Sequence, residues 1–419
     1  MSKPVVNIWG TPERAEPSAA QAEPWDTKWD LRNPATSGTA WVFYSSSDQT
    51  AVQRPVILSD GFAPGASNGR QLYDGLENGA YPFISTLREA GFDVVLLGYA
   101  DRTASIPDNA AVAIECIMRT IADRVGDAPL TVGGFSMGGL VTRYALAKME
   151  RQRMSHETAT YLSYDTPHCG AWLPLGVQAF AHFLKEHWGS DNQLLSAYSD
   201  LVNSPAARQM LRWHLATATD TTLDVAAGQH QDRTDFLNAL ERMGDWPQIP
   251  RLLGVANGTG TGTGNSIPAD DAAMAALGPN VSAQLRTQGP GRQTVAQMAE
   301  AREAPVSINT TGFPELDGAP GGLFPKAPLL GDAANFGMAA MLAGLVNGDP
   351  AELTHNTSTF VPTISAVASA DIDDHNALYS KVEREESRLH DFLCATSNEG
   401  HTVMTRELGE WIVAKLQEA

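Results

Sequence analysis

The chain has 419 residues, of which 43% are hydrophobic and 18% charged, as in an ordinary soluble globular protein. It is long enough to bury one large core with a sizeable insertion, or two cores. Its net charge of −19 argues against nucleic acid and anionic membranes as main partners, because long-range repulsion would oppose docking. No stretch approaches the roughly 18 consecutive apolar residues of a membrane span.

Neither a targeting segment nor a metal site is expected. Residues 1–10 contain one lysine but no apolar region and no small-residue cleavage site, so the sequence as given has no secretory signal. Cys116, Cys169 and Cys394 cannot form a fully paired framework and are interpreted as reduced thiols of a cytoplasmic protein. No HExxH, CxxC or carboxylate–histidine cluster has metal-ligand spacing, so we expect no metal and no other cofactor.

Short apolar runs alternate with helical patterns in the first part of the chain. Residues 1–35 are rich in Pro, Ala, Glu and Asp and are interpreted as an irregular N-terminal arm that lays Trp25 and Trp29 on the body. Strands are then expected at residues 40–44, 54–58, 92–99, 130–134 and 158–164, with helices at 81–90, around 114–125 and after residue 136. This alternation predicts a mostly parallel sheet covered by helices on both sides.

The alternation stops after Gly170. Residues 171–245 are mostly helical and are interpreted as a cap over the site, although packing onto the body explains most of their aromatic side chains. The GTGTGTG sequence at 258–264 lacks the lysine and helix of a phosphate loop and is interpreted as a flexible turn. Residues 258–350 show little periodicity and are expected to be irregular. Further strands are expected at 251–256, 360–367 and 392–395, before a final helix, which gives a core of residues 36–170 and 246–419.

The strongest chemical signal is GGFSMGG, at residues 133–139. It directly follows an apolar strand and precedes a helix, which is the context that a G-x-S-x-G nucleophile needs. A serine at such a turn occupies a strained backbone position, so its neighbours two positions away, Gly134 and Gly138, must lack side chains. The first amides of the helix also point at developing negative charge. We therefore predict that Ser136 is a nucleophile rather than an incidental serine in a glycine-rich turn.

With these features the sequence resembles the α/β-hydrolase superfamily, and within it bacterial lipase-like and esterase-like serine hydrolases. The resemblance rests on GGFSMGGLVTRYAL (133–146), TPHCGA (166–171), the order of the strands and a late histidine, and it covers about residues 40–171 and 355–419. It implies the α/β-hydrolase fold with a helical cap insertion. It also implies cleavage of a small-molecule acyl ester through an acyl-enzyme intermediate.

The resemblance implies two backbone amides as the oxyanion hole. Relatives keep one donor in the loop after an earlier strand, usually in a His-Gly-apolar sequence, and the corresponding loop here reads Ser59-Asp60-Gly61-Phe62. The amides of Phe62 and Met137 are then the expected donors. Asp60 departs from the family pattern, since an acid beside an oxyanion must point away from it. The alternative interpretation of Gly61-Phe62 is an ordinary turn.

His401 is the expected general base. It lies in a polar loop, after a strand and just before the last helix, where the family places its base. His375 and His390 lie nearer to charged, solvated segments and are interpreted as surface residues. His168 follows Pro in the TPH sequence and is interpreted as structural, as in similar lipases.

The sequence offers two candidate positions for the acid that orients the histidine. The usual position in the family, after the strand that follows the insertion, reads Val-Ala-Asn-Gly at 255–258 and holds no acid. Asp165 ends the strand after the nucleophile helix, an arrangement that resembles some animal lipases, and is the preferred candidate. Asp371, with Asp373 and Asp374 close behind, is the alternative.

Ser136, His401 and Asp165 together predict a carboxylic-ester hydrolase. An acyltransferase or thioesterase would use the same triad, and only water access and the acceptor pocket distinguish these activities. A binding protein that has lost catalysis is disfavoured, because the serine and the late histidine are both present. The natural substrate, acyl chain length and oligomeric state are not predicted.

Overall fold

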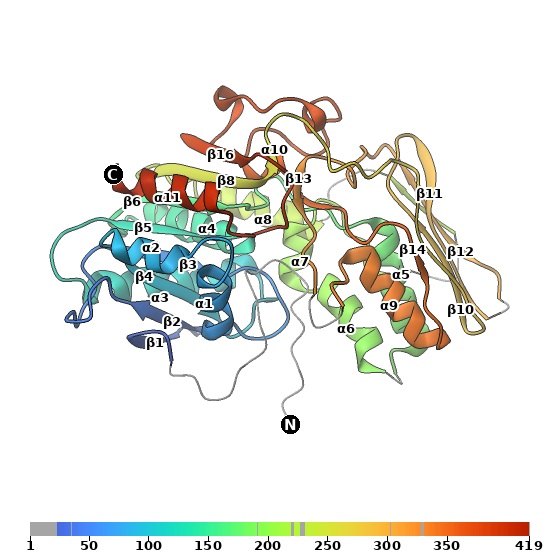
Figure 1. Cartoon of the computed structure of the whole chain (residues 1–419), viewed down its shortest axis with the longest axis horizontal. Helices are drawn as coiled ribbons and strands as arrows, with labels where there is room; N and C mark the ends of the chain where they lie inside the picture. Colours follow the sequence, from blue (N-terminus) through green and yellow to red (C-terminus); the bar gives the residue numbers. More distant parts are fainter. Residues whose placement is uncertain are drawn as a thin grey trace.

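Eight strands form the central sheet, in the order β1-β2-β4-β3-β5-β6-β8-β16 (Figure 1). The computed structural model describes residues 23–34, 36–190, 192–218, 222–226, 231–301, 303–327 and 331–418. The strands of this sheet are β1 (Thr27–Arg32), β2 (Ser37–Phe43), β3 (Pro55–Ser59), β4 (Asp93–Tyr99), β5 (Leu130–Phe135), β6 (Thr158–Tyr164), β8 (Arg251–Thr259) and β16 (Asp391–Ala395). β2 is antiparallel to β1 and β4, and all other neighbours are parallel. This order is that of the α/β-hydrolase fold, so the predicted fold class is confirmed.

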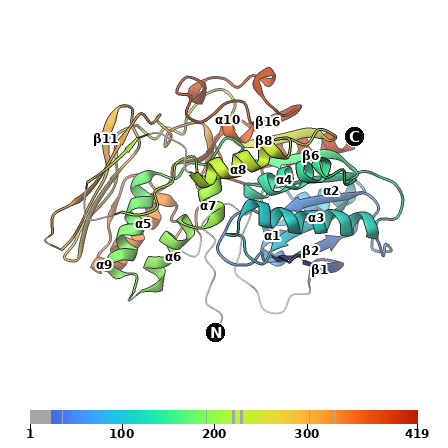
Figure 2. The same cartoon turned by 180° about the vertical axis from the view of Figure 1, so that it is seen from behind.

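Helices cover both faces of the central sheet (Figures 1 and 2). One face carries α1 (Gly69–Glu77), α2 (Phe83–Glu89) and α11 (Arg406–Gln417), and the other carries α3 (Ile106–Asp123), α4 (Met137–Arg151) and α8 (Gln231–Arg242). Successive side chains of β4 alternate between the two cores: Val95 and Leu97 join one hydrophobic cluster, Val94 and Leu96 the other. Burial on both faces explains why β3 and β4 are continuous apolar runs.

A second sheet of six strands, in the order β14-β9-β10-β11-β12-β7, lies beside the first (Figure 1). Its members are β7 (Leu223–Ala226), β9 (Ala272–Leu277), β10 (Val281–Arg286), β11 (Arg292–Glu300), β12 (Val306–Thr311) and β14 (Glu352–Leu353). All pairs are antiparallel except β7 with β12. The helices α5 (Leu175–Trp188) and α9 (Asn335–Asn347) pack on this sheet, and α6 (Gln193–Val202) packs against α5.

The expectation of an irregular insertion at 258–350 is therefore wrong. Strands β10 and β12 read VSAQLR and VSINTT and alternate buried with partly exposed side chains. This alternation is present in the sequence, but alanine, serine and threonine supply much of it, so the apolar signal is weak.

The expected cap at 171–245 is only partly helical. It contains α5, α6, α7 (Pro205–Met210) and α8, but also β7, which joins the second sheet. The helices also separate: α5 packs on the second sheet, whereas Phe236 of α8 stacks on Tyr144 of α4 at a ring-centroid distance of 6.4 Å. The segment is a mixed α and β insertion rather than a helical cap.

The N-terminal segment and residues 359–366 also differ from the predicted structure. Residues 27–32 of the expected arm form β1, in which Trp29 and Leu31 are buried between exposed neighbours, while residues 1–22 lie outside the described part. The strand expected at 360–367 is β15 (Thr359–Pro362) followed by the short helix α10 (Thr363–Ala366). β15 pairs with β13 (Gly321–Leu323) and not with the central sheet. Pro362 ends the strand because proline has no N–H for a ladder hydrogen bond.

Candidate active site

Ser136 lies at the turn between β5 and α4 with φ 52° and ψ −122°, a backbone conformation that costs a non-glycine residue energy. Its amide donates to Tyr164 O (2.9 Å), which continues the pairing of β5 with β6. A Cβ at Gly134 would lie 2.5 Å from Gly138 C, and a Cβ at Gly138 would lie 2.4 Å from Ser59 O. The two glycines are therefore required because the backbone is crowded around the strained serine.

The imidazole of His401 and the carboxylate of Asp165 form a fully buried pair. His401 Nδ1 lies 2.6 Å from Asp165 Oδ2, and neither side chain is exposed. The other carboxylate oxygen, Oδ1, accepts from the backbone amide of Asn257 (3.0 Å). Asp165 has φ 45°, so its backbone is also in the left-handed region. Both carboxylate oxygens thus have a donor, and the buried charge is held in one orientation.

The second ring nitrogen of His401 is available for chemistry. Nε2 is buried and has no hydrogen-bond partner among the described residues, so it makes no hydrogen bond to Ser136 in this state. Hydrogen bonds of this kind often tighten only when substrate is bound. The ring packs edge-to-face on Phe360, with the centroids 5.0 Å apart and the planes at 79°.

Two side chains that the sequence analysis missed hold the loop after His401. Tyr164 Oη and Asn257 Nδ2 both donate to Val403 O, at 2.8 and 2.9 Å. Burial raises the pKa of the Tyr164 hydroxyl well above its usual value, so it stays a donor at neutral pH. A sequence signal existed for Asn257, since it stands where the family usually places the acid.

The alternative acids have other partners. Asp373 forms an ion pair with Arg212, whose Nε lies 2.8 Å from Asp373 Oδ1, and Asp371 lies 3.4 Å from the same nitrogen. Asp374 accepts backbone amides two and three residues further along its own loop, at 2.9 and 3.0 Å. Of the four acids considered, Asp165 is the one that the structure brings to His401.

Asp60 departs from the family pattern, and its carboxylate is hydrogen-bonded within the loop that follows β3. Its Oδ1 accepts the amide of Gly61 (2.7 Å), and its Oδ2 accepts from Ser67 Oγ (2.6 Å). Arg102 Nη1 lies 3.4 Å from Oδ2, and both side chains of this ion pair are almost fully buried. The carboxylate therefore organises its own loop and is neutralised by a buried guanidinium.

The two expected oxyanion donors come from adjacent strands. Phe62 follows β3, and Met137 is the first residue of α4, directly after β5. β3 and β5 are neighbours in the sheet, and the amide of Met137 is one of the first four in its helix, which have no acceptor within the helix. Both residues are buried. The loop and the turn also touch, since Gly138 faces Ser59 O and Asp60 O.

His168 lies in a separate buried cluster. Its Nε2 lies 2.8 Å from Ser163 Oγ, its Nδ1 lies 3.3 Å from Arg143, and its ring centroid is 4.7 Å from that of Trp246. Burial, followed by the nearby Arg143 charge, lowers the pKa of His168 well below its usual value. A neutral ring with both nitrogens in hydrogen bonds serves packing rather than proton transfer.

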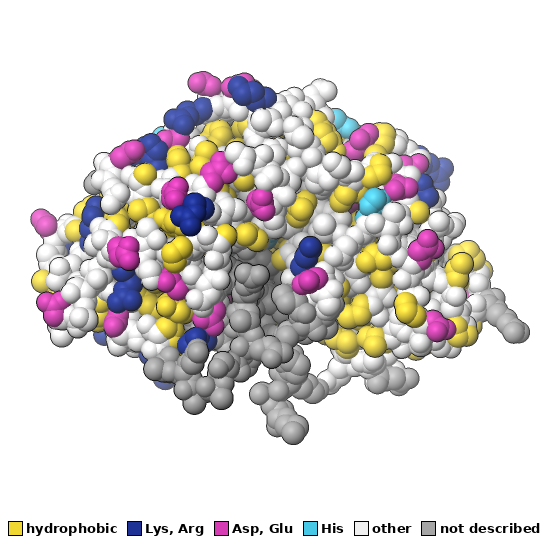
Figure 3. Space-filling model, in the orientation of Figure 1, with side chains coloured by type: hydrophobic (Ala, Val, Ile, Leu, Met, Phe, Trp, Pro, Cys, Tyr) yellow, Lys and Arg dark blue, Asp and Glu magenta, His cyan; other side chains and the backbone are white. Residues whose placement is uncertain are grey.

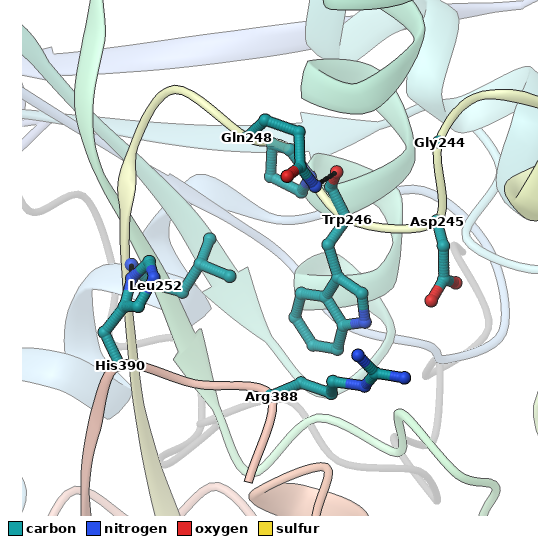
Figure 4. A pocket seen from close by; sticks show the side chains of 8 residues that line it. Gly244, Asp245, Trp246, Gln248, Leu252, Arg388 and His390 are labelled. Carbon is teal, nitrogen blue, oxygen red and sulfur yellow. Dashed lines mark hydrogen bonds between the residues drawn. The ribbon is translucent and has the colours of Figure 1, made fainter.

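A cavity of about 360 Å³ opens beside Trp246 (Figure 4). It is lined by Gly244, Asp245, Trp246, Pro247, Gln248, Leu252, Arg388 and His390. His390 Nδ1 accepts from the amide of Leu252 (2.8 Å), which ties the cavity rim to β8. None of the predicted site residues lines this cavity.

In the described ranges, no group of three His, Cys, Asp or Glu side chains could hold a metal ion, and the three cysteines are free thiols. None of the helices described combines the length and apolar character that a membrane crossing needs. Figure 3 shows acidic, basic and hydrophobic side chains mixed over the face that it presents.

A family model covers the part of the chain that holds the turn at Ser136. Residues 110–224 match the family described as "Putative serine esterase (DUF676)", a segment that runs from α3 to β7 and includes Ser136 and Asp165. The same segment contains the strained serine turn and part of the hydrolase sheet. The chain has the α/β-hydrolase fold, and over residues 110–224 it is similar to this esterase family. No curated protein sequence matches it.

Several solved structures resemble this α/β-hydrolase over about half of its length. The mature form of the Bacillus licheniformis lipase BlEst2 is 13% identical, with a TM-score of 0.30, over 54% of this chain and 73% of that one. An esterase from Pyrobaculum calidifontis is 13% identical, with a TM-score of 0.34, over 56% and 67%. The carboxylesterase EstE1, cloned from a metagenomic library, is 13% identical, with a TM-score of 0.30, over 55% and 79%.

Proposed function

We propose that this α/β-hydrolase cleaves a carboxylic ester, with Ser136 as nucleophile, His401 as general base and Asp165 as the orienting acid. The observation that carries the proposal is the buried hydrogen bond of 2.6 Å between His401 Nδ1 and Asp165 Oδ2. It is supported by the strained conformation of Ser136 and by the unpartnered His401 Nε2. A serine, a base and a group that orients the base are the parts that nucleophilic acyl transfer needs.

The first half of the reaction forms an acyl-enzyme. Ser136 Oγ attacks the ester carbonyl carbon, a new C–O bond forms, and the serine proton passes to His401 Nε2. Asp165 stabilises the imidazolium through Nδ1–H. The carbonyl electrons move to oxygen, and the proposed donors to this oxyanion are the amides of Phe62 and Met137. When the carbonyl re-forms, the bond to the alcohol breaks and His401 returns the proton to the leaving alkoxide.

The second half repeats these steps with water. His401 Nε2 takes a proton from the water as its oxygen attacks the acyl carbon, and a second tetrahedral intermediate forms in the same oxyanion hole. Its collapse breaks the bond to Ser136 Oγ, which regains its proton from His401. The products are a carboxylic acid and a regenerated enzyme.

Turnover of p-nitrophenyl esters of increasing chain length tests the proposal. The wild-type protein should hydrolyse at least one member and react covalently with a fluorophosphonate, while Ser136→Ala should lose both. A wild-type protein that neither turns over esters nor is labelled, or labelling that persists in Ser136→Ala, would refute it. Parallel assays with added alcohol and with a thioester measure whether acyl transfer or thioester cleavage is the faster reaction.

A further inference from the structure

A short strand of the insertion reaches into the triad. β13 extends the histidine loop as a parallel bridge between Leu323 and Gly400. Leu323 N donates to Glu399 O, and His401 N donates to Leu323 O, both at 2.8 Å. The backbone of His401 is thus hydrogen-bonded to a segment that is not part of the central sheet.

Gly322, in the middle of β13, touches both members of the buried pair. A Cβ built on it would lie 2.1 Å from Asp165 Oδ2, the oxygen that contacts His401 Nδ1, and 3.3 Å from His401 Cα. Its φ lies outside the left-handed region, so the backbone conformation does not require glycine. The position has no room for a side chain, because Asp165 and His401 occupy the space.

The same loop is fastened to the insertion at a second point. Asn398 Oδ1 accepts the amides of Thr259 (3.0 Å) and Gly321 (3.1 Å), and Asn398 Nδ2 donates to Thr263 O (3.0 Å). One side chain therefore joins the histidine loop to β13 and to the GTGTGTG sequence, of which Gly258 and Thr259 end β8 and the remaining residues form the turn after it. This contact gives that turn a structural purpose that a flexible linker would not have.

We propose that β13 is a positioning element of the active site and that Gly322 is its positioning residue. The strand holds the His401 backbone through hydrogen bonds. Because Gly322 has no side chain, Asp165 Oδ2 can occupy the position in which it contacts His401 Nδ1. The proposal rests on the hydrolase function proposed above. It adds that the insertion sets the geometry of the acid–base pair.

Gly322→Ala tests this directly, because the added methyl group and Asp165 Oδ2 cannot occupy the same space. We expect kcat on a p-nitrophenyl ester to fall about 100-fold with KM little changed, as for a misplacement of catalytic groups by about 1 Å. The pH profile of kcat/KM should change, because His401 and Asp165 can no longer meet in the same geometry. The downfield proton NMR signal of the histidine Nδ1–H should shift or disappear, a change that does not depend on turnover.

Gly79→Ala is the matched control, since Gly79 is exposed, has ordinary φ, and its Cβ would meet nothing closer than 3.3 Å. It should keep the wild-type kcat, pH profile and NMR signal. A folded Gly322→Ala protein with these wild-type properties would overturn the proposal. If circular dichroism shows that Gly322→Ala does not fold, Asn398→Ala decides: a shifted pH profile and NMR signal support the proposal, and unchanged ones overturn it. A wild-type protein without turnover or labelling refutes the hydrolase function, and the NMR signal still tests the positioning.

Discussion

Replacing Asp165 by asparagine should change the chemistry of the proposed triad while keeping its shape. Asp165 Oδ1 accepts the amide of Asn257, so the oxygen of an asparagine would take that position and its NH₂ group would face His401. A donor at Nδ1 forces the imidazole to carry its proton on Nε2. An Nε2–H cannot accept the proton of Ser136, so the variant should hold the wrong tautomer.

The expected loss is large because the pair is buried and short. Both side chains are fully buried at a separation of 2.6 Å, so water cannot replace the lost acceptor. The same acid-to-amide change in a Ser-His-Asp protease lowers kcat by about 10⁴-fold. At 1.36 kcal/mol per tenfold change, this is about 5 kcal/mol of barrier. The fold should be retained, since asparagine and aspartate have nearly the same volume.

Asp371→Asn is the control, because Asp371 is the rival acid and lies beside Arg212. Both variants would be assayed for kcat on a p-nitrophenyl ester and for the rate of fluorophosphonate labelling, with thermal unfolding as the measure of folding. Asp165→Asn should lose both activities and Asp371→Asn neither. The reasoning would be refuted if Asp165→Asn stayed within tenfold of the wild type, or if the loss fell on Asp371→Asn.

Three further changes test the surroundings of the site. Gly138→Ala should give insoluble or unlabelled protein in an expression and fluorophosphonate assay, because its Cβ would lie 2.4 Å from the backbone oxygen of Ser59; normal labelling would contradict this. Tyr164→Phe removes one of two donors to Val403 O and should cost about 1 kcal/mol in urea unfolding and lower kcat more than it changes KM. Burial raises the pKa of Asp317 to about 6, so between about pH 4 and 6 the folded chain binds this proton more tightly than the unfolded chain, and stability falls as pH rises. Asp317→Asn removes this pH-dependent contribution to the free energy of unfolding, which is at most about 3 kcal/mol. The Tm of the variant minus that of the wild type should therefore increase from pH 4 to pH 7. A constant difference would show that the Asp317 carboxyl does not titrate in this range.

The central sheet could be predicted because its signals are local. Strands such as β4 are continuous apolar runs, and the Gly134–Gly138 segment carries its own strand-turn-helix context. The sequence alone left the acid open, because Asp165 and His401 are 236 residues apart and their contact depends on how every intervening loop is packed. The catalytic role of Asp165 remains a prediction, whereas its contact with His401 is a feature of the fold.

The second sheet could not be recognised for a different reason. β10 and β12 alternate buried with more exposed side chains, but β9 and β11 do not, and the buried positions of β9 (AAMAAL) include two alanines, Ala273 and Ala276. Such strands gain their stability from neighbours on the sheet and from α5 and α9 rather than from their own composition. Tyr164, Asn257 and Gly322 were missed because their importance lies in tertiary contacts: a shared acceptor at Val403, and a missing Cβ against a carboxylate.

The pairing of β7 with β12 affects the order in which this chain can fold. Leu223 pairs with Ile308, 85 residues later (308 − 223), and β8 of the central sheet lies between them. At about 5–20 residues per second, β7 waits about 4 to 17 seconds for its partner during synthesis. It is four residues long and occupies the edge of its sheet, so it exposes little backbone while it waits. The second sheet is thus completed after β5, β6 and β8 of the central sheet, including the strand that precedes Ser136, have been synthesised.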